Sequence, residues 1–444
     1  MAIHYNNRYR LQVSGCKGIK GPETRNLQPV TCFKVFLMKL RSILPGLILL
    51  SCLSVAAQTD TSHLRISLLT CSPGVELYST FGHTALRVSD SAHSVDMVYN
   101  YGTFDDRDPN FYTKFTRGIM RYALSNYPYQ EFLQEYYSEG RGVIEQELLL
   151  TSEQKQRMYA ALQQNALEEN RYYNYYFHTD NCTTRARDMI ERQTGASVVF
   201  KDILPEKRPT YRNLIHTYLD KSKQSWSKFG IDLCLGSNFD DRVTNEQSMF
   251  LPDYLMKGLD HATADGRPLV AGTQTVVSAP PVPPAENLVT PMLLFFILFV
   301  ITGLLSFSSN KWAQRFLNVF DSLFFLCLGI FGLLTVTLWV IRVDTVCRNN
   351  FNVLWALPTH FFVAFVVYLK RKWLQQYFRI VFVLTALFTL CWFFIPQQIN
   401  VGVLPLLGII LLRSYFRGNL PFTKRVTTNV PNNFHNAKAI NIEL

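Results

Sequence analysis

A cysteine at the start of a predicted helix has the clearest chemical potential in this sequence. Asp180 and Asn181 are good N-cap residues, and apolar residues follow them at helical spacing until Gly195. This pattern predicts a helix whose first turn contains Cys182 and directs its thiol toward the core. The helix dipole and the unpaired amides of a first turn favour a thiolate and can hold a developing oxyanion. We therefore predict that Cys182 is a nucleophile; the alternative is a small buried cysteine that only packs.

A thiol nucleophile needs a base, and two histidines stand in suitable segments. His83 follows Gly82 at the start of a predicted strand, and period-two alternation places Arg87 on the same face. A histidine at such a strand start is well placed to meet the start of a helix across a cleft. His178 lies on the approach to the helix, where the pattern does not determine its direction. We expect His83 to be the base.

The next predicted strand, residues 95–102, has two polar residues on one face, Asp96 and Asn100. Either can orient the imidazole, as the third member of such catalytic groups does, and we favour Asp96. Arg87 can hold a phosphate or carboxylate of a substrate. Aromatic residues crowd the same region, and we expect most in the core and the rest in an apolar groove or at a membrane interface. We predict substrate contacts for Arg87, Asn100 and Tyr99.

The sequence lacks the patterns of metal and nucleotide sites. It has no paired metal-ligand spacing, no phosphate-cradling glycine loop and no serine-centred elbow. We therefore predict neither a metal site nor a cofactor.

The composition indicates a membrane protein. Of the 444 residues, 48% are apolar and 17% charged, which is too apolar for a disordered chain and for a typical soluble enzyme. The net charge of +11 at first suggests a nucleic-acid partner. The excess, however, lies after Asp321, between and beside long apolar runs, where basic loops set the orientation of membrane helices. We therefore predict that nucleic acid is not a partner.

Residues 38–57 have the three parts of a secretory signal peptide: a basic start, an apolar run and small residues at 55–57 before a cleavage point. We expect residues 1–37 to be an upstream extension, the alternative being a genuine N-terminal arm. Cys52 offers a lipoprotein processing site, but cleavage near Ala57 agrees better with the small-residue rule. The chain that follows is then exported.

The exported chain is predicted to have two regions joined by a spacer. Residues 58–272 contain strand-like and helix-like stretches and form the periplasmic catalytic domain, and 273–288 form a Pro-rich linker. Residues 289–414 are predicted to form a membrane domain with about five transmembrane helices, and 415–444 a basic cytoplasmic tail. The apolar runs lie at 291–308, 322–341, 353–369, 378–395 and 400–413.

Four of the nine cysteines fall in segments predicted on the oxidising side of the membrane: Cys71, Cys182, Cys234 and Cys347. Four such thiols permit a disulfide. We predict a bridge between Cys71 and Cys234, which leaves Cys182 free for chemistry.

Several stretches resemble the N-terminal periplasmic domain of the bacterial Lnb family. They are FGHTALRV at 81–88, VYNYGTF at 98–104, DNCTTR at 180–185 and EQSMFLPDYL at 246–255. The resemblance covers about 62–270, and the multi-span tail agrees with it, including Asn352, Trp355 and Pro358. It implies a lipoprotein N-acyltransferase of the bacterial inner membrane, a multi-pass protein with its catalytic domain in the periplasm.

The order of the two catalytic elements carries a second resemblance. A histidine strand before a cysteine helix is similar to permuted papain-like (NlpC-like) folds such as that of lecithin:retinol acyltransferase. This implies an α+β permuted papain-like periplasmic domain followed by an all-α multi-span membrane domain.

By the same resemblance, Cys182 would accept an acyl chain from a phospholipid as a thioester, with His83 as the base. The α-amine of a diacylglyceryl-cysteine lipoprotein would then attack the thioester. The implied partners are a phospholipid acyl donor and diacylated lipoproteins. Two alternatives remain: a cysteine amidase or peptidase that cleaves cell-wall peptides with the same dyad, and a non-catalytic membrane scaffold in which Cys182 only packs.

Overall fold

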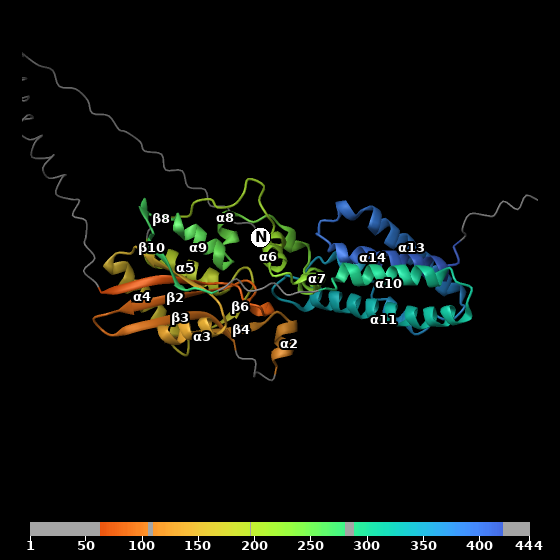
Figure 1. Ribbon diagram of the computed structural model, residues 1–444, viewed down its shortest axis with the longest axis horizontal. Coiled ribbons are helices and arrows are strands. Elements are labelled where there is room, and N and C mark those ends of the chain that lie inside the picture. Colours follow the sequence, from red (N-terminus) through yellow and green to blue (C-terminus); the bar gives the residue numbers. More distant parts are fainter. Residues whose placement is uncertain (1–62, 105–109, 196, 280–287, 421–444) are drawn as a thin grey trace, which may run out of the picture. The chain divides into compact units, whose positions relative to one another are not determined.

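The computed structural model describes residues 63–104, 110–195, 197–279 and 288–420 (Figure 1). The predicted extension at 1–37, the predicted signal peptide at 38–57 and the tail beyond 420 lie outside the described residues. The described chain has an α+β region followed by a helical region.

The α+β region is built on a seven-stranded antiparallel sheet with the order β10-β5-β1-β2-β3-β4-β6 (Figure 1). Its strands are β1 Leu64–Cys71, β2 His83–Asp90, β3 Val95–Phe104, β4 Met120–Pro128, β5 Val143–Leu148, β6 Tyr172–Tyr175 and β10 Val270–Val277. A register shift between Tyr101 and Thr103 leaves Gly102 as a bulge, with a φ of 101° that favours glycine. A second, small sheet contains β7 Val198–Val199, β8 Thr263–Ala264 and β9 Arg267–Pro268.

Helices cover both faces of the large sheet, so apolar residues point both ways along its central strands. On one face, strand residues such as Leu68 and Leu86 pack with residues of the helices α4 Ser152–Ala166, α5 Cys182–Thr194 and α9 Pro252–Asp260. On the other face, Ala85 and Val98 pack with the helix α3 Tyr129–Ser138. The remaining short elements of this region are α2 Phe111–Thr116, α6 Tyr211–Lys221, α7 Ser225–Cys234, α8 Asn245–Ser248 and the 3-10 turns η1 Leu77–Ser79 and η2 Ser237–Asp240.

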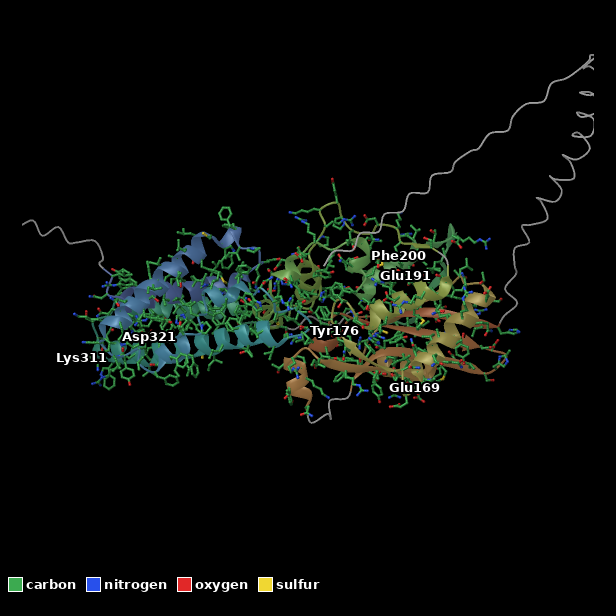
Figure 2. The ribbon with its side chains drawn as sticks, turned by 180° about the vertical axis from the view of Figure 1, so that it is seen from behind. Glu169, Tyr176, Glu191, Phe200, Lys311 and Asp321 are labelled. Atoms are coloured by element: carbon green, nitrogen blue, oxygen red, sulfur yellow. The ribbon has the colours of Figure 1, made fainter. Side chains whose placement is uncertain are left out.

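The helical region contains α10 Pro291–Ser306, α11 Lys311–Ile341, α12 His360–Ala364, α13 Lys372–Leu390 and α14 Leu404–Arg417. Within the described residues, α11 and α13 are long and apolar enough to cross a membrane, and α10 is a shorter apolar helix. Buried Asp321 on α11 binds Arg413 and Arg417 of α14 at 2.6–2.9 Å, and Arg413 also donates to Ser306 of α10 (Figure 2). These ion pairs compensate the buried charges, because an unpaired charge within the hydrocarbon of a membrane has a high free energy.

The apolar run at 353–369, predicted as one span, is not a continuous helix in the structure. It forms part of the 3-10 turn η3 Phe351–Leu354, then the five-residue α12 and turns, far short of the ~20 residues of a span. The reason is close backbone packing against α11. An added Cβ at Gly329 or Gly332 would lie 2.0 Å from a backbone atom of this segment. The number of spans therefore stays a prediction.

Gly332 tests this packing. Gly332→Ala places a methyl group against the carbonyl oxygen of Ala356, so the backbone must shift, and we expect a lower unfolding temperature for the full chain in detergent. Gly303→Ala on α10 is the matched control, because nothing lies within 4 Å of an added Cβ there, and it should leave the unfolding temperature unchanged or raise it. Equal effects of the two substitutions would contradict the packing.

Candidate active site

Cys182 is the first residue of α5, as predicted, and the residue before it fixes the helix start. The Asn181 side chain accepts hydrogen bonds from the backbone N–H groups of Thr183 and Thr184, both at 2.9 Å. The Thr184 hydroxyl accepts in turn from the Asn181 N–H at 2.8 Å, which completes a capping box. The Asn181 amide also donates to the carbonyl oxygens of Phe177 and Phe250, both at 2.8 Å. The cap thus ties the helix start to two neighbouring segments.

His83 begins β2, and its imidazole lies close enough to the Cys182 thiol for each group to shift the pKa of the other. The turn before it requires glycine: Gly82 has a φ of 80°, and a Cβ there would lie 2.7 Å from the Cys71 carbonyl oxygen. This tight approach brings the chain into β2 with the imidazole facing α5. The predicted pairing of a strand-borne histidine with a helix-borne cysteine therefore exists in the structure.

Asn100 on β3 is the third member of the group. Its Oδ1 lies 2.5 Å from His83 Nε2, and its Nδ2 donates to the Tyr127 hydroxyl at 3.1 Å. Because the amide nitrogen of Asn100 donates to Tyr127, the amide oxygen is the atom that faces the imidazole. We infer that His83 Nε2 carries a proton toward Asn100 and that Nδ1 serves the thiol.

The electrostatics of the pair favour charge separation. Burial of the Cys182 thiol would raise its pKa, but the charge of His83 and hydrogen bonds from His83, the Thr84 backbone N–H and the Thr183 hydroxyl lower the pKa to about 7. Removal from water would lower the pKa of His83, whereas the thiolate and the hydrogen bonds with Cys182 and Asn100 raise it. A thiolate–imidazolium pair is therefore accessible near neutral pH.

Asp96, predicted to orient the imidazole, does not contact it. Its carboxylate binds the Arg87 guanidinium at 2.8 and 2.9 Å, and it lies opposite Ser89, toward the other end of the β2–β3 ladder. Residues four apart on a strand share a face but are separated by about 13 Å along it. Asn100, the open alternative, therefore takes the place that we predicted for Asp96.

Two predicted substrate contacts lie away from Cys182. Arg87 also binds Glu145 at 3.0 Å and stacks on the Tyr129 ring at 3.5 Å, so its charge is already compensated. Tyr99 is buried in the core cluster of the sheet. Neither residue lines the cavity beside Cys182. His178, the other histidine considered as base, packs against the rings of Tyr211 and Phe239 instead.

The predicted disulfide is wrong, because Cys71 and Cys234 are both free thiols. Cys71 lies in β1 directly opposite His83, whereas Cys234 ends α7. Burial raises the pKa of the Cys71 thiol to about 12, in spite of a hydrogen bond with Tyr136 that lowers it. Cys71 is therefore a protonated, unreactive neighbour of the site.

A cavity of about 170 Å³ opens beside the dyad and is largely aromatic. The rings that line it are Tyr78, Phe81, Phe104, Tyr122, Tyr175, Phe177 and Phe250. Tyr122 and Tyr175 are stacked with ring centroids 4.4 Å apart. Gly102 faces both catalytic groups: a Cβ there would lie 3.6 Å from Cys182 Cβ and 3.7 Å from His83 Cε1. Such an apolar space suits a hydrocarbon chain rather than a polar peptide.

The sequence pattern indicates aromatic residues in this region but does not separate pocket from core. Tyr122 and Phe250, which come from β4 and from the segment before α9, line the cavity and were not predicted to do so. Phe250 had a detectable signal, since it stands within one of the family-like stretches. Tyr122 had none, because its neighbours in the pocket follow only from strand pairing.

The pKa of Cys182 predicts its alkylation profile. The rate of Cys182 alkylation by iodoacetamide should rise with pH and reach half its maximum near pH 7, because the thiolate is the reactive form. His83→Ala removes the positive partner while burial remains, so the pKa rises and the rate at pH 7 falls by roughly 50-fold. Cys182→Ser protein measures the background of other thiols. A profile unchanged in His83→Ala would contradict the dyad.

The residue that contacts His83 on β3 gives a matched pair of variants. Asn100→Ala removes the oxygen that holds His83. We expect Cys182 alkylation at pH 7 to slow by about tenfold, which corresponds to the net free energy of one hydrogen bond. Asp96→Ala, on the same strand and face, should leave this rate within about twofold, because Asp96 binds only Arg87 and does not contact the imidazole. The reverse ranking would restore Asp96 as the orienting residue.

Two family models match the chain. A family model described as the Lnb N-terminal periplasmic domain matches residues 54–217, the range that contains His83, Asn100 and Cys182. A second, described as the Lnb transmembrane domain, matches residues 284–425, which contain α10 to α14. No curated protein and no solved structure matches the chain. The chain therefore belongs to the Lnb family, as an inner-membrane protein with its N-terminal domain in the periplasm.

Proposed function

We propose that this chain is a lipoprotein N-acyltransferase that moves an acyl chain from a phospholipid, through a thioester on Cys182, to the α-amine of a diacylglyceryl-cysteine lipoprotein. Family membership indicates an enzyme of lipoprotein biosynthesis. The observation that carries the specific reaction is the ionisable Cys182–His83 pair beside an aromatic cavity, in a chain that also has a transmembrane domain.

The order of elements supports a permuted papain-like arrangement for the periplasmic domain. The histidine strand β2 precedes the cysteine helix α5 in the chain. β2 is a central strand of the antiparallel sheet, and α5 packs on that sheet. The third group, Asn100, comes from the strand next to β2. We propose this fold relationship on element order and site geometry alone.

The first step forms the acyl-enzyme. The Cys182 thiolate attacks the ester carbonyl of the phospholipid, and the carbonyl oxygen becomes an oxyanion. The backbone N–H groups of Thr183 and Thr184 already donate to the Asn181 side chain. We therefore assign the backbone N–H of Cys182 as the first-turn donor to the oxyanion. As the C–O bond breaks, the His83 imidazolium gives its proton to the departing glycerol oxygen. A lysophospholipid leaves, and Cys182 holds the thioester.

The second step transfers the chain. The neutral α-amine of the lipoprotein cysteine attacks the thioester carbonyl, and neutral His83 accepts a proton from the amine nitrogen. The C–S bond then breaks, the amide forms, and the thiolate–imidazolium pair is restored. The aromatic lining limits water near the thioester, which favours aminolysis over hydrolysis.

The same cavity weighs against the two alternatives. A cell-wall amidase needs an open polar cleft for a hydrophilic peptide, whereas most rings around Cys182 form an apolar wall. A scaffold in which Cys182 only packs gives no reason for a buried thiol whose pKa lies near 7.

Cys182→Ser tests the function. The full chain reconstituted with phospholipid should gain the mass of one acyl chain on the Cys182 peptide, and addition of a diacylated lipopeptide should discharge it into an N-acylated product. Cys182→Ser should form neither species, whereas the control Cys391→Ser, at an exposed position after α13, should form both. Complete N-acylation by Cys182→Ser, or release of cell-wall peptides by the wild-type protein, would overturn the proposal.

A further inference from the structure

The opening of the active-site cavity is marked by two exposed rings. Among the residues that line the cavity, Tyr78 is 75% exposed and Phe104 is 47% exposed, while the others are buried or half-buried. Tyr78 belongs to η1, and Phe104 ends β3. A molecule that reaches Cys182 through this opening must pass between apolar surfaces.

The segment that bears Tyr78 carries further exposed apolar side chains and is firmly held. Val75 and Leu77 are both exposed, so three apolar residues lie within four positions. Gln224 donates to the Val75 carbonyl oxygen at 3.0 Å and to the Thr80 hydroxyl at 2.9 Å. A tethered segment that keeps such side chains outside the core indicates an apolar partner.

Helix α2, the next described element after β3, contacts the residues that follow α11. On α2, Tyr112 is 82% exposed and Phe115 is 52% exposed. Arg342 donates to the Phe115 carbonyl oxygen at 3.1 Å, and the Val343 N–H donates to the Arg117 carbonyl oxygen at 3.0 Å. These partners directly follow α11, which lies within the transmembrane-domain match.

The inner wall of the cavity is continuous with the same membrane helix. Phe81, Phe177 and Phe250 of the wall belong to one apolar cluster that also contains Leu338 near the end of α11. Val346 and Cys347 from the loop after α11 join this cluster. One packed apolar cluster therefore joins the end of α11 to the rings beside Cys182.

We infer that the cavity opening is a membrane-contact surface, in which Val75, Leu77, Tyr78, Phe104 and the exposed side of α2 lie in the periplasmic leaflet of the inner membrane. The donor phospholipid then delivers its acyl chain laterally from the leaflet to Cys182, without exposing the chain to water. Aromatic side chains are favoured at the membrane interface, and the exposed Arg117 beside them suits lipid phosphates. The lateral path rests on the proposed function, whereas the membrane contact does not require any catalysis.

Photocrosslinking tests the contact without turnover. In full-chain Cys182→Ser protein in phospholipid nanodiscs, a benzophenone amino acid replaces Tyr78, Tyr112 or Tyr137. Tyr137 on α3 is the matched control, since it is a tyrosine with 70% exposure on the sheet face away from the catalytic helix. We expect lipid adducts at 78 and 112 with at least about tenfold higher yield than at 137, as measured by mass spectrometry. Equal yields at the three positions, or no adduct at 78, would overturn the contact.

A second variant tests the path. Val75 and Leu77 do not line the cavity, so the double substitution Val75→Gln and Leu77→Gln alters only the outer surface. We expect acylation of Cys182 from bilayer phospholipid to fall by about tenfold, while alkylation by iodoacetamide stays at the wild-type rate, which shows an intact dyad. The control Tyr137→Gln should retain both rates.

Unchanged acylation in the double variant would overturn lateral delivery. If the wild-type protein forms no acyl-enzyme with any donor, the proposed function fails, but the crosslinking yields still decide the membrane contact. If the double variant loses alkylation as well, its fold is damaged, and crosslinking at 78 against 137 decides alone.

Discussion

The electrostatic pairing of Cys182 with His83 is the interaction on which the rest of this site depends. Burial alone would raise the pKa of the Cys182 thiol. It does so for Cys71 on β1, whose pKa is raised to about 12. Only the imidazole and the hydrogen bonds around the sulfur reverse that effect and bring the pKa of Cys182 to about 7. The two buried cysteines thus differ in pKa, because the imidazole and the hydrogen bonds outweigh burial at Cys182, whereas the Tyr136 hydrogen bond and the charge of Arg141 do not outweigh it at Cys71.

The pair requires two elements far apart in the chain to meet within hydrogen-bonding reach. Gly82 permits the tight turn that leads into β2, and Asn181 fixes the first residue of α5. Asn181 also holds the carbonyl oxygens of Phe177 and Phe250, whose rings line the cavity. One side chain therefore holds both the start of the helix that bears Cys182 and two of the segments that form the apolar wall beside it.

Polar side chains in apolar surroundings join the helical region to α7. Asn350 donates to the carbonyl oxygens of Leu233 and Cys234 at 2.8 and 3.1 Å, and Asn400 donates to Asp232 at 2.8 Å. The Asn350 amide satisfies the last two carbonyl groups of α7, which would otherwise remain without intrahelical partners, and the Asn400 amide binds the carboxylate of Asp232. Because Gln224 just before α7 holds the segment of Tyr78, the helical region and the cavity opening are linked through one short helix.

The sequence by itself determined the features that depend on neighbours along the chain. The start of α5 followed from a local cap, the strand of His83 from a glycine and a period of two, and the membrane region from runs of apolar residues and basic loops. Tertiary structure decided whatever depends on which segments meet. Asp96 and Asn100 share a strand face, and only the place of His83 in the ladder selects Asn100. The apolar run at 353–369 resembles a span. In the structure it forms short helical turns, whose backbone packs closely against glycines of α11. Strand register and close backbone approach are non-local properties, so a single sequence pattern does not specify them.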